Sequence, residues 1–116
     1  MVRRTLAFAS AAAFALLVAP AASFADDAPG KTLFLAQKCS LCHSIASQAI
    51  EHTTKSEKMV GPALDGVGSK HDAAWMALYV TKKEKLHDKA HPKEAKLSDE
   101  ELKTLTDWLA ALPAAP

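Results

Sequence analysis

The sequence predicts an all-α domain, and three observations support this fold class. Segments with apolar residues at helical spacing occur near the start, the middle and the end of residues 26–116. Two of these segments begin with residues typical of helix N-termini. No stretch alternates apolar and polar residues with period two, the pattern of a half-buried strand. We therefore expect three or more short helices and no strands.

Residues 1–25 are expected to be a signal peptide that is cleaved from the domain. A short basic start precedes an apolar run over residues 6–19, and small residues stand at Ser23 and Ala25. The run is shorter than the roughly 20 residues that a membrane-spanning helix needs, so a retained anchor is the less favoured alternative. The pair Arg3-Arg4 is a weak match to a twin-arginine export signal. We expect an exported, periplasmic protein without stable membrane insertion, whose domain spans residues 26–116.

The charge of the domain is close to balanced. The first 25 residues hold two of the 14 basic residues and none of the 13 acidic ones, so 12 basic and 13 acidic residues remain. This balance gives no indication of nucleic-acid binding. A domain of this size forms only a modest core, so a large buried cofactor would add to its stability.

The first helix is expected over residues 31–38 (KTLFLAQK), where it would carry Cys39 at its C-terminal end. Residues 44–58 are polar and mixed, with one turn of helix at 45–50 followed by a loop. Residues 60–68 contain Gly and Pro among apolar residues, a composition that disfavours a long element.

The middle helix is expected to begin at a capping box formed by Ser69 and Asp72. Apolar residues at helical spacing follow, and the helix is expected to end between residues 82 and 85. The next stretch, to Lys96, is rich in lysine and histidine and is interrupted by Pro92.

The last helix has the strongest signal. Ser98 and Glu101 have the spacing of a capping box, and Pro113 marks the end of the segment. Its apolar stripe consists of Leu102, Leu105, Trp108, Leu109 and Leu112.

The segment Cys39-Ser40-Leu41-Cys42-His43 is the Cys-x-x-Cys-His signature of covalent haem attachment. Two thiols one helical turn apart can add to the two vinyl groups of one porphyrin, and the histidine can then bind the iron. We therefore expect one haem c, attached by thioethers to Cys39 and Cys42, with His43 as an iron ligand.

A different chemistry at this motif is less favoured. A thioredoxin-like redox site requires a βαβ framework, and a structural zinc site requires a second pair of ligands, to which His87 and His91 come nearest. A chance occurrence is the third alternative. An exported chain that spent both its cysteines on a structural disulfide would not place them so close together.

Over residues 26–116 the chain resembles the small bacterial class I cytochromes c. The resemblance rests on CSLCH at 39–43, MVGPAL at 59–64, HP at 91–92 and SDEELKTLTDWL at 98–109, in the order found in the family. It implies an all-α class I fold of short helices around one covalent haem, with the N- and C-terminal helices packed together. Phe34 or Leu35 against Trp108 would form that contact.

The resemblance also implies a role for Pro62. In the family, the carbonyl of this proline accepts the second imidazole N–H of the proximal histidine, so Pro62 would orient His43. The chain departs from the family in a longer spacer between His43 and Gly61 and in the place usually held by Met-Pro, which here reads His91-Pro92.

The second iron ligand is the open question. We favour His91, which stands in the place of the family's ligand, and the alternatives are His87, Met59, Met76 or an open position. Met59 is expected to pack beside Gly61, and Met76 is expected to fill the core. We expect His52 and His71 to be ordinary surface histidines.

Trp75 and Tyr79 are expected to pack in the haem pocket, with Trp75 contacting the cofactor. Six lysines around the presumed distal ligand could form a rim that docks acidic redox proteins, although nearby acids dilute the charge and an ordinary solvated loop is equally favoured. The lysines are Lys82, Lys83, Lys85, Lys89, Lys93 and Lys96.

These observations favour an electron carrier between redox proteins, active as a monomer and not an enzyme, since no constellation of catalytic residues is evident. A bis-histidine iron would be low-spin and of lower potential than one with methionine. The alternatives are a gas-binding or sensory haem protein with an open sixth site, and a haem subunit of a larger redox enzyme.

Overall fold

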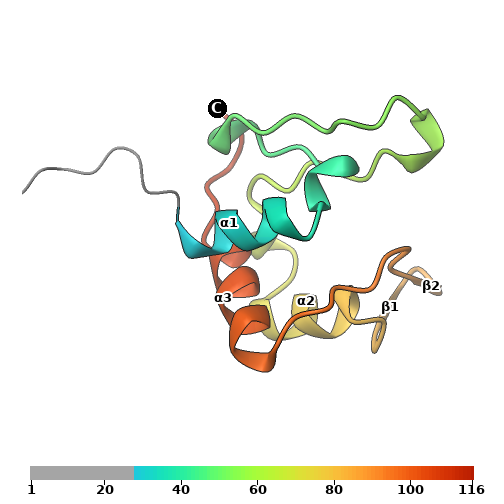
Figure 1. The fold of residues 1–116 in the computed structure, drawn as a ribbon, viewed down its shortest axis with the longest axis vertical. Coiled ribbons are helices and arrows are strands. Elements are labelled where there is room, and N and C mark those ends of the chain that lie inside the picture. The colour runs from blue at the N-terminus through green and yellow to red at the C-terminus, as the bar shows by residue number, and fades with distance from the viewer. Residues whose placement is uncertain (1–27) are drawn as a thin grey trace, which may run out of the picture.

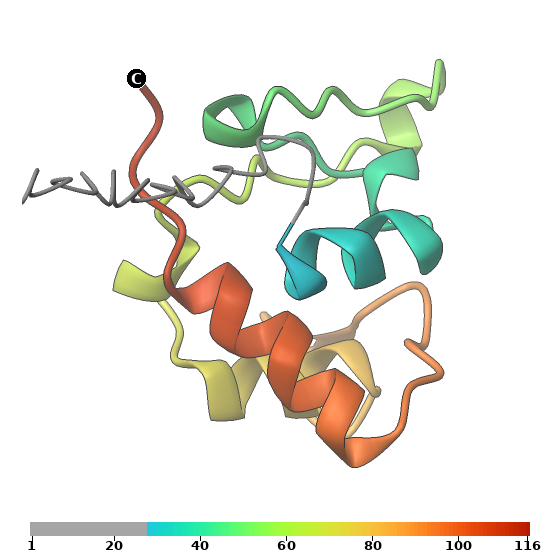
Figure 2. The same cartoon turned by 60° about the vertical axis from the view of Figure 1, so that its left-hand side comes forward.

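The computed structural model describes residues 28–116, so the expected signal peptide lies outside the described residues. Three α-helices form the framework: α1 (Pro29–Ala36), α2 (Ala73–Val80) and α3 (Asp99–Ala110). Helix α3 packs against both α1 and α2, as the two ribbon views show (Figures 1 and 2). Four single 3-10 turns lie between α1 and α2, at Cys39–Leu41, Ala46–Gln48, Glu57–Met59 and Val67–Ser69.

Helix α1 begins with a proline, whose fixed φ suits the first turn of a helix. It ends at Ala36, earlier than the sequence indicated, because Lys38 has a left-handed backbone with φ of 58°. The N–H of Lys38 donates to the carbonyl of Leu35 at 3.0 Å, which closes the last turn. The chain therefore changes direction before Cys39, and this cysteine lies in a 3-10 turn of its own.

The contact between α1 and α3 depends on a glycine. A Cβ on Gly30 would lie 2.1 Å from the Cβ of Trp108, so only glycine permits this approach. One turn later, the ring of Phe34 packs against Trp108 with centroids 5.8 Å apart. Phe34 is fully buried whereas Leu35 is 41% exposed, so Phe34 makes the expected helix contact.

Helix α3 begins at the predicted capping box. The Ser98 hydroxyl accepts from the N–H of Glu101, and the Glu101 carboxylate accepts from the N–H of Ser98, both at 3.2 Å. The core of the described residues lies on this helix and around it. Replacing a large buried side chain with a small one at such positions typically lowers the free energy of unfolding by about 2–5 kcal/mol. The buried apolar residues are Phe34, Ile45, Ile50, Met76, Leu105, Leu109 and Leu112.

Helix α2 has a different N-cap from the predicted one. The carboxylate of Asp72 accepts from the N–H of Trp75 at 2.7 Å, so Asp72 is the cap itself and the Ser69 capping box is wrong. The Ser69 hydroxyl instead donates to the carbonyl of Gly66. The helix ends at Val80, earlier than the predicted 82–85, and Lys82 then adopts a left-handed backbone with φ of 60°.

A short hairpin follows α2, where no strand was predicted. Strand β1 (Lys85–Leu86) pairs antiparallel with β2 (Lys89–Ala90). His87 and Asp88 form the connection, and both have positive φ, the conformation of a tight two-residue hairpin turn. The hairpin is small, and the all-α class with packed terminal helices is confirmed.

Candidate functional site

Cys39, Cys42 and His43 lie on a tightly turned segment. The N–H groups of Cys42 and His43 both donate to the carbonyl of Cys39, at 3.2 and 3.0 Å. Both cysteines are partly buried free thiols. Burial raises the pKa of the Cys39 thiol, while the positive charge of Lys93 acts in the opposite direction. The motif is therefore a compact loop with two thiols available for bonding.

His43 is fixed by backbone on its far side. Its Nδ1 lies 2.7 Å from the carbonyl oxygen of Pro62, the contact that the resemblance implied. Because Nδ1–H donates to this carbonyl, Nε2 keeps its lone pair for a metal. A Cβ on Gly61 would lie 2.5 Å from Cε1 of His43, so the backbone of Gly61 lies directly against the ring. Burial is the main cause that lowers the pKa of His43, which favours the neutral form that binds metals.

Hydrogen bonds join residues 42–47 to residues 61–65. The N–H of Gly61 donates to the carbonyl of Cys42 at 2.8 Å, and the N–H of Leu64 donates to that of Ser44 at 3.0 Å. The carboxylate of Asp65 accepts from the N–H groups of Ala46 and Ser47, each at 2.8 Å. The region expected to form a helical turn at 45–50 contains the 3-10 turn Ala46–Gln48, with Ile45 and Ile50 paired across it.

His91 faces His43. The two imidazole centroids are 6.2 Å apart, and the ring planes differ by 11°. The Nδ1 of His91 hydrogen-bonds to the carbonyl of Lys93, so its Nε2 is also left with a lone pair. The structure thus brings together His43, Pro62 and His91, three of the predicted site residues.

The segment that carries His91 is tied to α1 and α2. The ammonium of Lys93 donates to the carbonyl of Gln37 at 2.8 Å, and the N–H of Lys96 donates to the side-chain oxygen of Gln37 at 3.2 Å. The N–H of Ala95 donates to the carbonyl of Val80 at 2.8 Å. Sequence reasoning missed Gln37 and Asp65, because a single polar residue in a helix or loop gives no signal of a distant backbone partner.

The remaining candidate ligands lie elsewhere. His87 is exposed at the tip of the hairpin, and Met76 is buried in the core as expected. Met59 is 48% exposed, with Thr54 Oγ1 3.9 Å from its sulfur, and its expected packing role stays a prediction. His52 is exposed as expected, but His71 is partly buried and stacks on Trp75 with centroids 3.8 Å apart, so it is not an ordinary surface histidine.

Trp75 lies in a row of rings between His71 and Tyr79. The centroid of Tyr79 is 4.9 Å from that of Trp75 and 5.1 Å from that of His91. Tyr79 is therefore the member of the row that reaches the site. The expected contact of Trp75 with a cofactor stays a prediction. Within the described residues, its ring contacts are with His71 and Tyr79.

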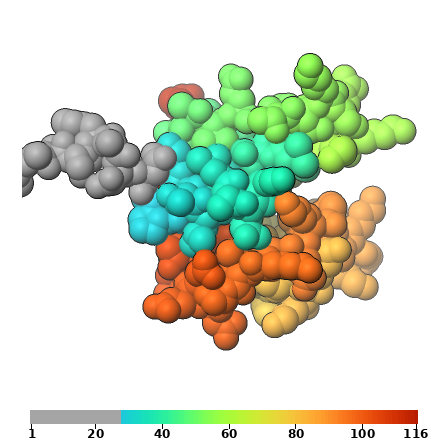
Figure 3. Space-filling model, viewed as in Figure 1, coloured from blue at the N-terminus to red at the C-terminus, as the bar shows by residue number. Residues whose placement is uncertain are grey.

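The geometry fits a haem between the two histidines. An imidazole nitrogen lies about 2 Å from the metal it binds and roughly 1 Å from its own ring centre, so imidazoles on opposite sides of one metal have centres about 6 Å apart. The observed separation of 6.2 Å matches this value. In the space-filling view the surface is hollowed between the green segment and the orange segment (Figure 3). Three large apolar side chains near Cys42 and Gly61 are exposed: Leu41, Met59 and Val60. A flat apolar group bound here would cover them.

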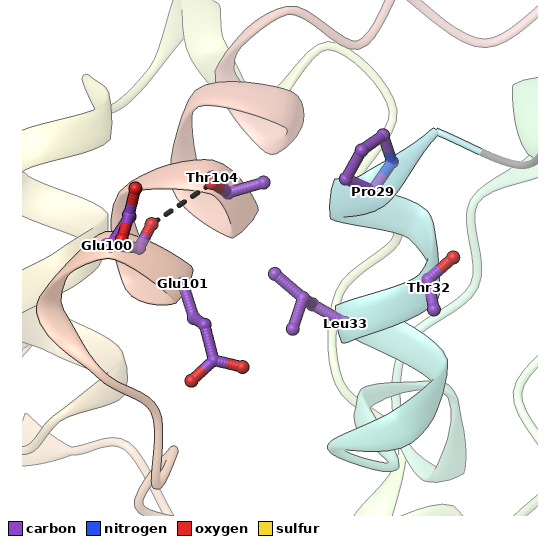
Figure 4. Close-up of a pocket in the computed structure, with 6 residues that line it drawn as sticks. All are labelled: Pro29, Thr32, Leu33, Glu100, Glu101 and Thr104. Atoms are coloured by element: carbon purple, nitrogen blue, oxygen red, sulfur yellow. Dashed lines mark hydrogen bonds between the residues drawn. The ribbon is translucent and has the colours of Figure 1, made fainter.

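A shallow groove between α1 and α3 is distinct from this site. Thr104 donates to the carbonyl of Glu100 on its α3 wall, as the close-up shows (Figure 4). None of the predicted site residues lines it. The lining residues are Pro29, Thr32, Leu33, Glu100, Glu101 and Thr104.

No helix among residues 28–116 is long and apolar enough to cross a bilayer.

The family model described as "Cytochrome c" matches residues 28–113, nearly all of the described chain. Comparisons with curated proteins and with solved structures gave no significant match.

Proposed function

The chain belongs to the cytochrome c family and is a haem-binding electron-transfer protein, and from this premise we propose that it is an exported bacterial electron carrier with bis-histidine iron. The family binds haem c through the two cysteines of the motif, here Cys39 and Cys42. His43 and His91 would hold the iron from opposite sides. The facing of their rings, with centroids 6.2 Å apart and nearly parallel planes, is the observation that carries the proposal.

The haem supplies a one-electron Fe(III)/Fe(II) couple, and the chain's residues determine how it is held. The carbonyls of Pro62 and Lys93 each accept from the Nδ1–H of one histidine, which raises the basicity of both imidazoles. Two basic imidazoles stabilise Fe(III) more than an imidazole with a thioether does, so we expect a low potential. No catalytic base or substrate site is required for this role, and we propose that the protein is not an enzyme.

The proposed partners are redox proteins with acidic docking surfaces. Six lysines lie on the segment on either side of His91. They are Lys82, Lys83, Lys85 and Lys89 before it, and Lys93 and Lys96 after it. Complementary charge increases the rate of encounter more than the affinity, which suits a carrier that must dissociate quickly. We propose that the mature carrier acts in the periplasm as a monomer, after cleavage behind Ala25.

The ligation is tested by the electronic and EPR spectra of the oxidised holoprotein. We expect a low-spin spectrum without an Fe–S(Met) charge-transfer band in the wild type, and loss of that low-spin signal in His91→Ala. His87→Ala is the matched control, because His87 lies four residues earlier on the exposed hairpin tip and should leave the spectrum unchanged. A methionine band in the wild type, or unchanged ligation in His91→Ala, would contradict the proposal.

A further inference from the structure

The aromatic row that begins just before α2 and continues along it ends at the proposed distal ligand. His71 and Trp75 stack with planes 16° apart, and Trp75 and Tyr79 with planes 20° apart. Tyr79 then meets His91 nearly perpendicularly, at 76° and with centroids 5.1 Å apart. The row therefore begins with two stacked contacts and ends in an edge contact on an imidazole.

The sequence explains why the row is regular. Trp75 and Tyr79 are four residues apart on α2, which places their side chains on one side of the helix. His71 stands four residues before Trp75, just ahead of the N-cap Asp72. The Asp72 carboxylate holds the N–H of Trp75 at 2.7 Å and so fixes the first turn of α2. Each ring limits the movement of the next, and Tyr79 receives the support of both.

The two histidines are oriented by separate parts of the chain. His43 is held by the Pro62 carbonyl and by the backbone of Gly61. The Nδ1 of His91 is held by the Lys93 carbonyl. The imidazole ring can still rotate about that hydrogen bond, so packing against neighbouring side chains has to limit the rotation. Tyr79 is the aromatic residue whose ring contacts His91 in the described chain.

We propose that Tyr79, supported by Trp75 and His71, is a positioning residue that keeps the plane of His91 parallel to that of His43. The proposal rests on the proposed function, in which both histidines bind the iron. The observed angle of 11° between their planes is the quantity that Tyr79 would control.

Parallel planes have an electronic signature. The π electrons of two parallel imidazoles act on the same iron d orbital, so that orbital is raised above its partner and the EPR spectrum is rhombic. Perpendicular planes raise both orbitals equally, and the spectrum is then dominated by one large g value. The orientation of His91 can thus be read from the oxidised protein without an activity assay.

The test compares EPR spectra of the oxidised wild-type, Tyr79→Phe and Tyr79→Leu holoproteins. We expect a rhombic wild-type spectrum, and Tyr79→Phe should retain it because the ring is preserved and no hydrogen bond of the Tyr79 hydroxyl occurs within the described residues. Tyr79→Leu should shift the largest g value upward. Leu78→Ala is the control, since this neighbour on α2 is 44% exposed.

Unchanged g values in a low-spin Tyr79→Leu protein would overturn the proposal, as would a wild-type spectrum dominated by one large g value. Trp75→Leu should give a smaller upward shift, and it decides the question by the same criterion if Tyr79→Leu does not accumulate as holoprotein. Failure of the bis-histidine assignment is distinguishable, because it would appear in the wild type as a methionine band or as high-spin iron.

Discussion

The two sides of the proposed iron site are built from different kinds of contact. On the proximal side, His43 donates a hydrogen bond to the carbonyl of Pro62, 19 residues away in the sequence. The N–H of Gly61 in turn donates to the carbonyl of Cys42. On the distal side, His91 bonds to a carbonyl only two residues away, and bonds from Lys93 and Lys96 to Gln37 help to hold its segment. The proposed proximal ligand is thus held directly by a carbonyl that is distant in the sequence. The proposed distal ligand is held by a carbonyl of its own loop, and that loop is in turn anchored to Gln37.

The largest expected effect breaks the proximal side. In His43→Ala we expect the yield of covalent holoprotein to fall by more than about tenfold, because losing even a supporting partner of a metal ligand typically lowers affinity 10–100-fold. Haem staining after denaturing electrophoresis measures this yield. His52→Ala, at an exposed position, is the control. A normal yield from His43→Ala would contradict the assignment of His43 as the proximal ligand.

Gly61→Ala is expected to disturb the proximal side without removing a ligand. The new Cβ would lie 2.5 Å from Cε1 of His43, and overpacking of this kind costs about 1–3 kcal/mol. The Soret spectrum and the free energy of unfolding should both change. Gly30→Ala, which clashes with Trp108 instead, should destabilise the fold but leave the spectrum as in the wild type.

Lys93→Met is expected to loosen the distal side alone. The variant loses the hydrogen bond to Gln37 and keeps the Lys93 carbonyl, so the distal ligand should dissociate more easily by about 0.5–1.5 kcal/mol. A denaturant titration that follows the low-spin spectrum measures this change, with Lys89→Met as the control on β2. If both variants released the ligand at the same denaturant concentration, the anchoring role of Lys93 would be refuted.

Asp65→Asn tests the smallest effect, which lies on the proximal loop. Hydrogen bonds from the backbone N–H groups of Ser47 and Ala46 lower the pKa of Asp65 in the folded protein. The stabilisation is therefore present above the unfolded pKa of about 3.9 and is lost as the pH falls through the lower folded value. The melting temperature of the wild type should fall more steeply than that of the variant over this acidic range, and parallel curves would argue against the role of Asp65.

Much of the fold was predictable because its signals are local. The capping box at Ser98 and the apolar stripe of α3 depend on neighbouring residues, and both predictions are confirmed. The ends of α1 and α2 were misplaced, because left-handed conformations at Lys38 and Lys82 leave no mark on residues that ordinarily favour helices. The hairpin was missed for a similar reason, since its turn uses His87 and Asp88 instead of a glycine pair.

The site divides in the same way. Cys39, Cys42 and His43 form a contiguous motif, and the sequence also indicated His91 and Pro62 through the resemblance. The aromatic row was only partly foreseen, because stacking depends on the start of α2 at Asp72 and on the place where a later loop returns. Such contacts between distant segments require the tertiary structure.

The bond between Lys93 and Gln37 has a consequence for the order of folding. It closes a separation of 56 residues, whereas the contact of His43 with Pro62 closes one of 19. Long closures lose more chain entropy and tend to form later. We expect the distal loop to close last in the nascent protein, which would leave the attachment motif beside Gln37 accessible while the thioether bonds form.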